Sequence, residues 1–81
     1  MERFGEKLRQ LRQNHHVTLA WLANKLGYST HSYISEVEAG QKIPTAQFIL
    51  KVARLFQVTT DELMKDELEI DLVNSNMTDT L

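Results

Sequence analysis

The sequence predicts a small all-α domain built from five short helices. Apolar residues recur every three to four positions along most of the chain, which is the period of an amphipathic helix. Threonine and glycine stand at the ends of several of these runs, where helix caps favour them. Cysteine is absent and 42% of the residues are apolar, so we expect one packed core without disulfides.

The first two expected helices each have an apolar stripe at helical spacing. In the first helix, expected over residues 2–14, the stripe consists of Phe4, Leu8, Leu11 and, as a less regular member, His15. In the second helix, the stripe consists of Leu19, Leu22, Ala23 and Leu26. Thr18 precedes this second run and can accept a hydrogen bond from an otherwise unpaired amide, while Gly27 follows it as a left-handed C-cap.

The third and fourth helices follow a polar turn at residues 28–30. The third is expected to bury Ile34 and Val37 and to end at Gly40, with a proline a few residues beyond it. The fourth is expected to begin after Thr45 as its N-cap. Its buried stripe consists of Ile49, Val52, Ala53 and Phe56, with Leu50 beside it.

The fifth helix is expected to begin at Thr60 as its N-cap. Asp61 and Glu62 then lie in its first turn, where negative charge suits the helix dipole. Leu63 and Met64 are expected to face inward. Five short helices joined by short turns would form a compact all-α domain.

The chain is expected to divide into a folded domain over residues 1–65 and an acidic extension over residues 66–81. In the extension, the apolar residues alternate with polar ones; the apolar residues are Leu68, Ile70 and Leu72. This alternation is a strand pattern, but Leu68 and Leu72 also fit a prolonged fifth helix. Residues 73–81 are polar and are expected to fray.

The net charge of −2 hides an asymmetry between these two parts. Residues 1–65 hold all nine Lys and Arg against six acids, whereas residues 66–81 hold five acids and no base. The body therefore carries a net charge of +3 and the extension −5. Local charge decides whether a surface attracts phosphate, so the positive body is compatible with nucleic-acid binding.

Several function classes are disfavoured by the sequence. No apolar run approaches the roughly 18 residues of a membrane span, and the charged first residues do not resemble a signal peptide, so we expect a cytoplasmic protein with no membrane contact. No Gly-rich phosphate loop or acid–base set is recognisable, so we expect neither an enzyme nor a cofactor. His15 and His16 are adjacent and lack a third ligand at suitable spacing, so we expect no metal site.

The second and third helices form the informative pattern. Two short helices are expected to meet across a three- or four-residue turn that Gly27 opens. The small side chain of Ala23 permits close approach in the middle of the first of them, and Ile34 and Val37 anchor the second. This pattern is typical of a helix-turn-helix, whose second helix enters the major groove of DNA.

Residues 3–65 resemble the phage-repressor-like (Cro/repressor, XRE) helix-turn-helix family. The markers are LRQLR in the first helix, LAxxLG in the second, YISxVExG in the third, a proline after it, and VTTDELM at the end. Each is weak alone, but their order and spacing form a specific signal. The resemblance implies a compact five-helix DNA-binding domain and a role in regulating transcription.

The resemblance also implies roles for individual residues. The third helix would begin at Thr30 as N-cap, and the positions that usually contact base edges are Thr30, His31, Ser32 and Glu36. The positions that contact phosphate are Thr18 and Lys42. Arg12 and Glu38 match a structural ion pair between the first helix and the end of the third.

Three departures from the family pattern affect the expected contacts. Leu19 stands where family members usually have Gln, which removes one phosphate contact. The turn after Gly27 is one residue longer than usual, which leaves two registers open for residues 28–32. The third helix has no Lys or Arg, so the common contact from those residues to guanine is absent. Base recognition would then depend on His31, Glu36, water and DNA shape.

Two features leave alternatives open. Trp21 lies on the expected outer face of the second helix, where it either packs on neighbouring side chains or contacts DNA backbone or a protein partner. The alternating residues Leu68, Ile70 and Leu72 either pack onto the domain or pair with a second copy. We favour dimerisation, because one small helix-turn-helix makes few contacts and dimers bind two half-sites about 34 Å apart.

We therefore expect a transcriptional regulator, and more specifically a repressor, that binds double-stranded DNA as a homodimer. The alternative is a protein-interaction module with the same fold, such as an antitoxin or an adaptor. It would contact its partner through Trp21 or the acidic extension.

Overall fold

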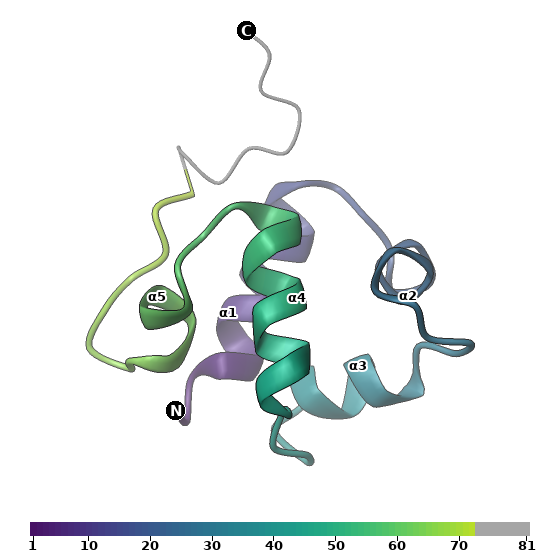
Figure 1. The fold of residues 1–81 in the computed structure, drawn as a ribbon, viewed down its shortest axis with the longest axis horizontal. Helices are drawn as coiled ribbons and strands as arrows, with labels where there is room; N and C mark the ends of the chain where they lie inside the picture. The colour runs from purple at the N-terminus through teal and green to yellow at the C-terminus, as the bar shows by residue number, and fades with distance from the viewer. Residues whose placement is uncertain (73–81) are drawn as a thin grey trace, which may run out of the picture.

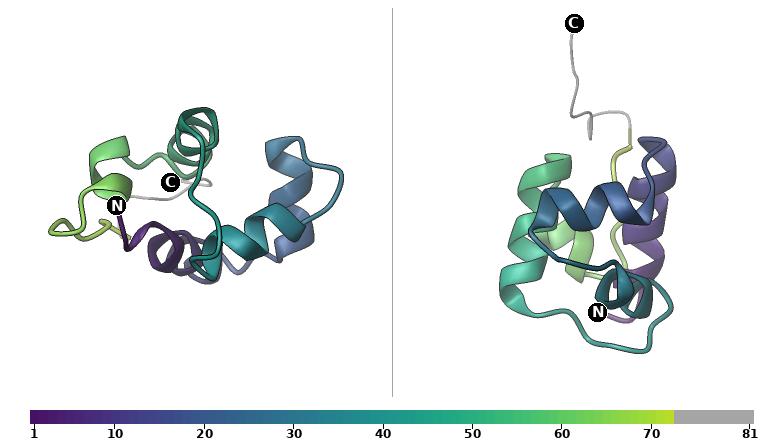
Figure 2. Two further views of the ribbon diagram at one scale, coloured as in Figure 1. Left: turned by 90° about the horizontal axis from the view of Figure 1, so that it is seen from below. Right: turned by 90° about the vertical axis from the view of Figure 1, so that its right-hand side faces the viewer.

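A computed structural model describes residues 1–72, and the expectation for residues 73–81 lies outside that range. The described helices are α1 (Phe4–Asn14), α2 (Leu19–Leu26), α3 (Ser32–Glu38), α4 (Ala46–Phe56) and α5 (Thr60–Met64). The predicted all-α class is confirmed. Figures 1 and 2 place α2 and α3 at one end of the molecule and α5 at the other, with α1 and α4 between them. Within residues 1–72, none of these helices has the length and apolar character that crossing a bilayer requires.

Threonine hydroxyls cap the starts of three helices. Thr18 and Thr45 begin α2 and α4 as predicted, each accepting a hydrogen bond from an amide of the first turn. The prediction for α5 was wrong by one residue, because Thr59 is the N-cap in place of Thr60. The Thr59 hydroxyl accepts from the Glu62 amide at 3.0 Å, and the Glu62 carboxylate accepts from the Thr59 amide at 2.9 Å. Only Thr59 has a Glu three residues later, which this reciprocal capping box requires.

The start of α3 also differs from the prediction. Its N-cap is His31, without a side-chain capping bond, and the Thr30 hydroxyl instead accepts from the Ser32 amide at 3.4 Å. Five residues separate α2 from α3, more than the three or four expected. Gly27 ends α2 with φ of 86°, as predicted. The longer turn allows Tyr28 to stack on the ring of Tyr33, with centroids 5.5 Å apart.

The core contains nearly all the residues predicted from periodicity. The buried ones are Phe4, Leu8, Leu11, Leu22, Ala23, Leu26, Ile34, Val37, Ile49, Val52, Ala53, Phe56 and Leu63. Leu19 is partly buried against them. Met64 was expected to face inward but is 42% exposed, because it lies about 100° around the helix from Leu63. Phe48 is also fully buried, although it was not predicted as a core residue.

Lys7 is the least expected member of the interior. Its side chain is fully buried, and its ammonium group donates hydrogen bonds of 2.6 Å to the carbonyls of Glu62 and Lys65. These carbonyls lie at the C-terminal end of α5, where backbone acceptors have no partner within the helix. A cation is favourable at this negative end of the helix dipole. Lys7 therefore joins α1 to the end of α5.

Residues 66–72 follow α5 as an irregular segment, which we call the C-terminal strap. It does not prolong the helix, because Lys65 is already extended, and no strand forms within residues 66–72. Ile70 is only 8% exposed and belongs to the core, and Leu72 is partly buried against that core. Leu68 is 37% exposed. For Ile70 and Leu72, packing onto the domain is thus the alternative that the structure supports.

The strap is attached to the start of α1. The Asp66 carboxylate accepts hydrogen bonds from the amides of Glu2 and Arg3 at 3.0 and 2.9 Å. The Arg3 guanidinium in turn donates to the Glu69 carboxylate at 2.9 Å. These bonds hold the pKa of both acids below their ordinary values, chiefly through the Arg3 amide for Asp66 and the Arg3 guanidinium for Glu69. Asp66 thereby binds the amides of the two residues just before α1, where a negative charge also suits the helix dipole, while Glu69 binds the Arg3 side chain.

Candidate nucleic-acid interface

One face of α3 is turned away from the core. Ile34 and Val37 are buried, as predicted, and they fix the opposite face outward. The outward residues follow helical spacing and form what we call the outward stripe, which consists of Ser32, Ser35, Glu36 and Ala39. Three of these side chains are short, so a partner surface could approach the α3 backbone closely.

The predicted base-contacting residues fall in two places. Ser32 and Glu36 belong to the outward stripe, whereas Thr30 and His31 are exposed in the turn just before α3. Ser35 and Ala39 were not predicted as site residues. Their spacing of three and seven residues from Ser32 was the signal that could have found them.

An ion pair connects α3 to α1. The Glu38 side chain is 2% exposed and accepts from the Arg12 guanidinium at 2.8 and 3.1 Å. The predicted contact between Arg12 and Glu38 is therefore present. Arg9, which was not predicted, also donates to Glu38 at 3.3 Å. Hydrogen bonding to Glu38 raises the pKa of Arg12, so this guanidinium stays charged. A two-pronged Arg–carboxylate contact fixes orientation as well as distance.

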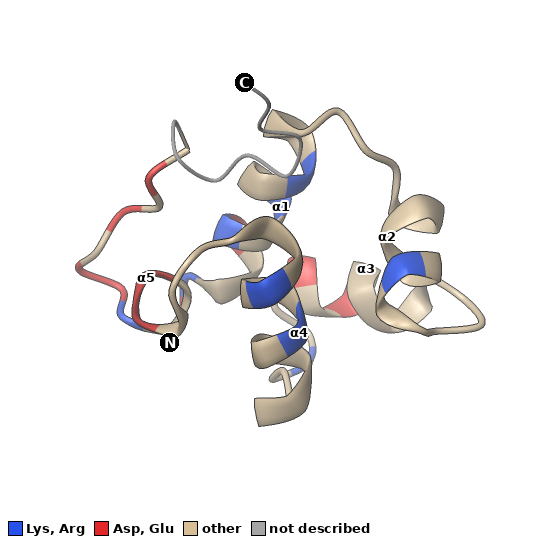
Figure 3. Ribbon diagram, turned by 45° about the horizontal axis from the view of Figure 1, so that its top comes forward, with Lys and Arg blue, Asp and Glu red and all other residues tan. Residues whose placement is uncertain are grey.

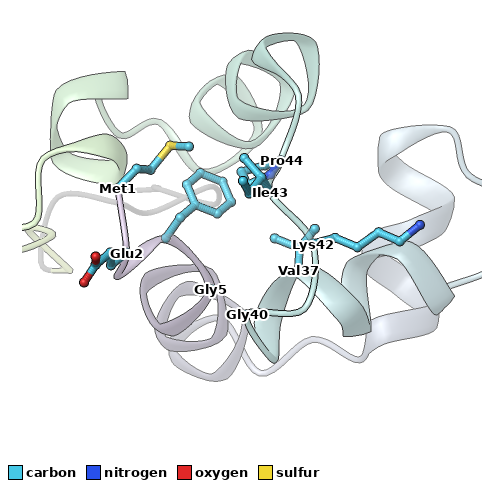
Figure 4. Close-up of a pocket in the computed structure, with 9 residues that line it drawn as sticks. Met1, Glu2, Gly5, Val37, Gly40, Lys42, Ile43 and Pro44 are labelled. Atoms are coloured by element: carbon cyan, nitrogen blue, oxygen red, sulfur yellow. The ribbon is translucent and has the colours of Figure 1, made fainter.

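Close backbone approach forms a second connection between α1 and α3. A Cβ added to Gly5 would lie 2.7 Å from the Glu38 carbonyl oxygen and closer still to that of Val37. Only a glycine therefore permits this contact without a shift. Gly5 also borders a groove of about 430 Å³ between the start of α1 and the loop after α3. Figure 4 shows Met1 and Ile43 at this groove.

Aromatic side chains connect α3 to α4. The Tyr33 ring meets Phe48 edge to face, with centroids 5.1 Å apart, and its other side stacks on Tyr28. The Tyr33 hydroxyl accepts a hydrogen bond from the Thr45 amide at 3.2 Å, at the start of α4. Burial raises the pKa of Tyr28. Together these contacts join the turn before α3, α3 itself and α4.

The predicted phosphate-contacting residues lie at the edges of the α2–α3 unit. The Thr18 hydroxyl accepts from the Trp21 amide at 3.0 Å, and a hydroxyl that accepts can still donate its proton. Lys42 has an exposed side chain and forms a 3.8 Å ion pair with Glu36. Figure 4 shows the Lys42 side chain directed away from the groove that its stem borders.

Charge is distributed unevenly over the described residues. Figure 3 shows acids along α5 and the C-terminal strap and also on α3, while Lys and Arg mark α1, α2 and α4. The described acids of the extension lie against the start of α1, where Asp66 and Glu69 bind Arg3. The end that carries α2 and α3 lies away from most of the acids, which favours approach of a polyanion to that end.

Trp21 lies against the core edge on α2. Its side chain is partly buried and packs on the core, and the Lys25 ammonium group lies 5.6 Å from the ring centroid. The structure thus shows the packing alternative for this residue. A cation above the ring also leaves a positive charge at the outer surface of α2.

Comparisons with known proteins agree with this geometry. The family model described as a helix-turn-helix domain matches residues 3–65. The HTH-type transcriptional activator BcrR of Enterococcus faecalis is 36% identical over 72 residues, covering 89% of this chain and 35% of the relative. The HTH-type transcriptional regulator YobD of Bacillus subtilis (strain 168) is 37% identical over 61 residues, covering 75% and 54%. The chain thus spans between about a third and about half of these relatives. No solved structure matches significantly.

Proposed function

The chain belongs to the helix-turn-helix domain family, as its resemblance to XRE regulators predicted, and from this premise we propose that it binds specific sites on double-stranded DNA to regulate transcription. In this proposal α3 enters the major groove. The observation that carries it is the outward stripe of α3, a row of small and polar side chains on a helix held by three neighbouring elements. A major groove about 12 Å wide admits such a helix.

The proposed base contacts come from the outward stripe and the turn before it. They are made by Thr30, His31, Ser32 and Glu36. A phosphate would be bound by Thr18 at the N-terminus of α2, where amides without a helical partner and the helix dipole both favour an anion. A second phosphate would be bound by the exposed Lys42.

We propose that the protein acts as a homodimer on two half-sites. Ile70 is buried, which leaves Leu68 as the exposed apolar residue of the strap, and Met64 of α5 is also exposed. Both belong to the end opposite α2 in Figure 1. Light scattering of the full chain and of Leu68→Glu would test this contact. A dimer that survives Leu68→Glu unchanged would argue against it.

The proposed sign of regulation is repression. Repression by occlusion needs only DNA binding, whereas activation needs a further contact with the transcription machinery. The relative named as an activator is matched over 35% of its length, so its sign is not transferred to this chain. A reporter gene with the selected site overlapping its promoter would test the sign.

Selection of binding sites from random DNA tests the central proposal. We expect a two-fold symmetric site to be enriched, and the slope of log affinity against log salt to count the phosphate contacts. His31→Ala and Ser32→Ala should weaken binding to the selected site. Glu67→Ala, in the strap at the opposite end, is the control and should not. Absence of enrichment even at low salt would favour the protein-interaction alternative.

A further inference from the structure

Both acids of α3 are paired with bases, but the two pairs differ in kind. Glu38 is buried and binds two arginines of α1. Glu36 is the only charged residue of the outward stripe, and its side chain is 41% exposed. It faces Lys42, whose ammonium group lies 3.8 Å away, beyond ordinary hydrogen-bond distance. The Glu36–Lys42 pair is therefore weak and easily exchanged.

DNA would compete for both members of this pair. Lys42 forms a shorter, charge-assisted hydrogen bond if it turns to a phosphate. Glu36 would then lose its cation in a groove lined by phosphates, where an unpaired carboxylate is repelled. Binding is most favourable where the groove supplies a hydrogen-bond donor to Glu36. The pair thus makes stable contact depend on the base that Glu36 meets.

We infer that Glu36 is the specificity-determining residue of this interface and recognises the exocyclic amine of a cytosine. This inference rests on the proposed function. An ionised carboxylate can only accept hydrogen bonds. In the major groove, guanine and thymine present acceptors at their hydrogen-bonding edges, and adenine presents its N6 donor beside the N7 acceptor. Cytosine presents the N4 donor alone, so it fits Glu36 with the least repulsion.

The rest of the outward stripe strengthens this assignment. Ser32, Ser35 and Ala39 have short side chains, so Glu36 extends furthest from the helix among the four. No Lys or Arg is present in α3 to bind guanine. The strongest base preference in each half-site should therefore come from Glu36.

Binding to single-base variants of the selected site tests the inference, with fluorescence anisotropy as the readout. The wild-type protein should bind about tenfold more weakly when one particular cytosine is replaced. Glu36→Gln should shift the preference at that position from cytosine toward adenine, whose N6 and N7 match an amide. Glu36→Ala should abolish the preference there, leave the other positions unchanged, and strengthen binding to random DNA.

Two further variants complete the design. Lys42→Ala should weaken specific and random DNA binding alike and lower the salt slope by about one. Glu67→Gln makes the matched change at the opposite end and should leave every base preference as it is. Circular dichroism would confirm that each variant keeps the wild-type helix content.

The outcomes separate the inference from the proposed function. If the wild-type protein selects a site but Glu36→Ala retains every base preference, the inference is wrong and the function stands. If Glu36→Gln and Glu36→Ala strengthen binding equally to all sequences, Glu36 acts only by repulsion and the inference is also wrong. If the wild-type protein selects no DNA, the proposed function fails first.

Discussion

Replacing Glu38 with glutamine should destabilise the domain strongly. The Glu38 side chain is 2% exposed, so the substitution leaves the Arg12 charge, itself only 18% exposed, without its counter-ion. Breaking a buried pair in this way typically costs 3–5 kcal/mol. The glutamine oxygen can still accept one bond, which favours the lower end, about 3 kcal/mol. With a urea dependence of about 1 kcal/mol/M for a domain this small, the unfolding midpoint should fall by about 3 M.

Urea unfolding followed by circular dichroism would measure this loss against a graded control. The Arg9 side chain, the outer partner of Glu38, is 53% exposed. Arg9→Gln should therefore cost less than about 1 kcal/mol of stability. Replacing Arg12 and Glu38 together by methionine should recover much of the loss, because no charge is then left buried. The reasoning is refuted if Glu38→Gln costs no more than Arg9→Gln.

Three further substitutions give distinct expectations. Gly5→Ala should lower stability by about 2 kcal/mol in thermal unfolding, since its Cβ would press on α3 carbonyls and outweigh the better helix propensity of alanine. Lys7→Met should lower the free energy of unfolding, measured by urea titration, by about 2 kcal/mol, because two carbonyls at the end of α5 lose their donor. Lys25→Met, at an exposed position, should lower it little. The Thr59 amide at the N-cap of α5 holds the pKa of Glu62 below its ordinary 4.5. The stability that ionised Glu62 gives the fold is therefore complete above that pH and is lost as the pH falls through the lowered pKa. In an acid titration of stability, Glu62→Gln should show a smaller decline than the wild type.

Local chemistry made most helix boundaries and the core predictable. A threonine before an apolar stripe and a glycine after it act within one turn, so they are visible in the sequence. The error at α5 arose from two adjacent threonines. The capping box would have resolved it, because only Thr59 has a glutamate three residues on.

Long-range contacts explain what the sequence could not predict. Lys7 is buried because its acceptors come from the end of α5, 55 and 58 residues later. The strap avoids both predicted conformations because Asp66 binds amides at the start of α1, more than 60 residues away. Contacts between residues so far apart leave no periodic pattern in the sequence. For the proposed interface, the spacing of the outward stripe was visible, but the pairing of Glu36 with Lys42 depended on the conformation of the loop after α3.

The orientation of α3 is imposed by its neighbours. A seven-residue helix is too short to be stable alone, so its position depends on tertiary contacts. Glu38 fixes its end to α1, while the Tyr33 hydroxyl fixes its start to α4. The side chains of the outward stripe are mostly short, so they cannot keep contact with DNA if α3 tilts away from it. A substitution that shifts α1 or α4 against α3 should therefore weaken DNA binding before it unfolds the domain, and affinity at constant helix content is the sensitive measure of these contacts.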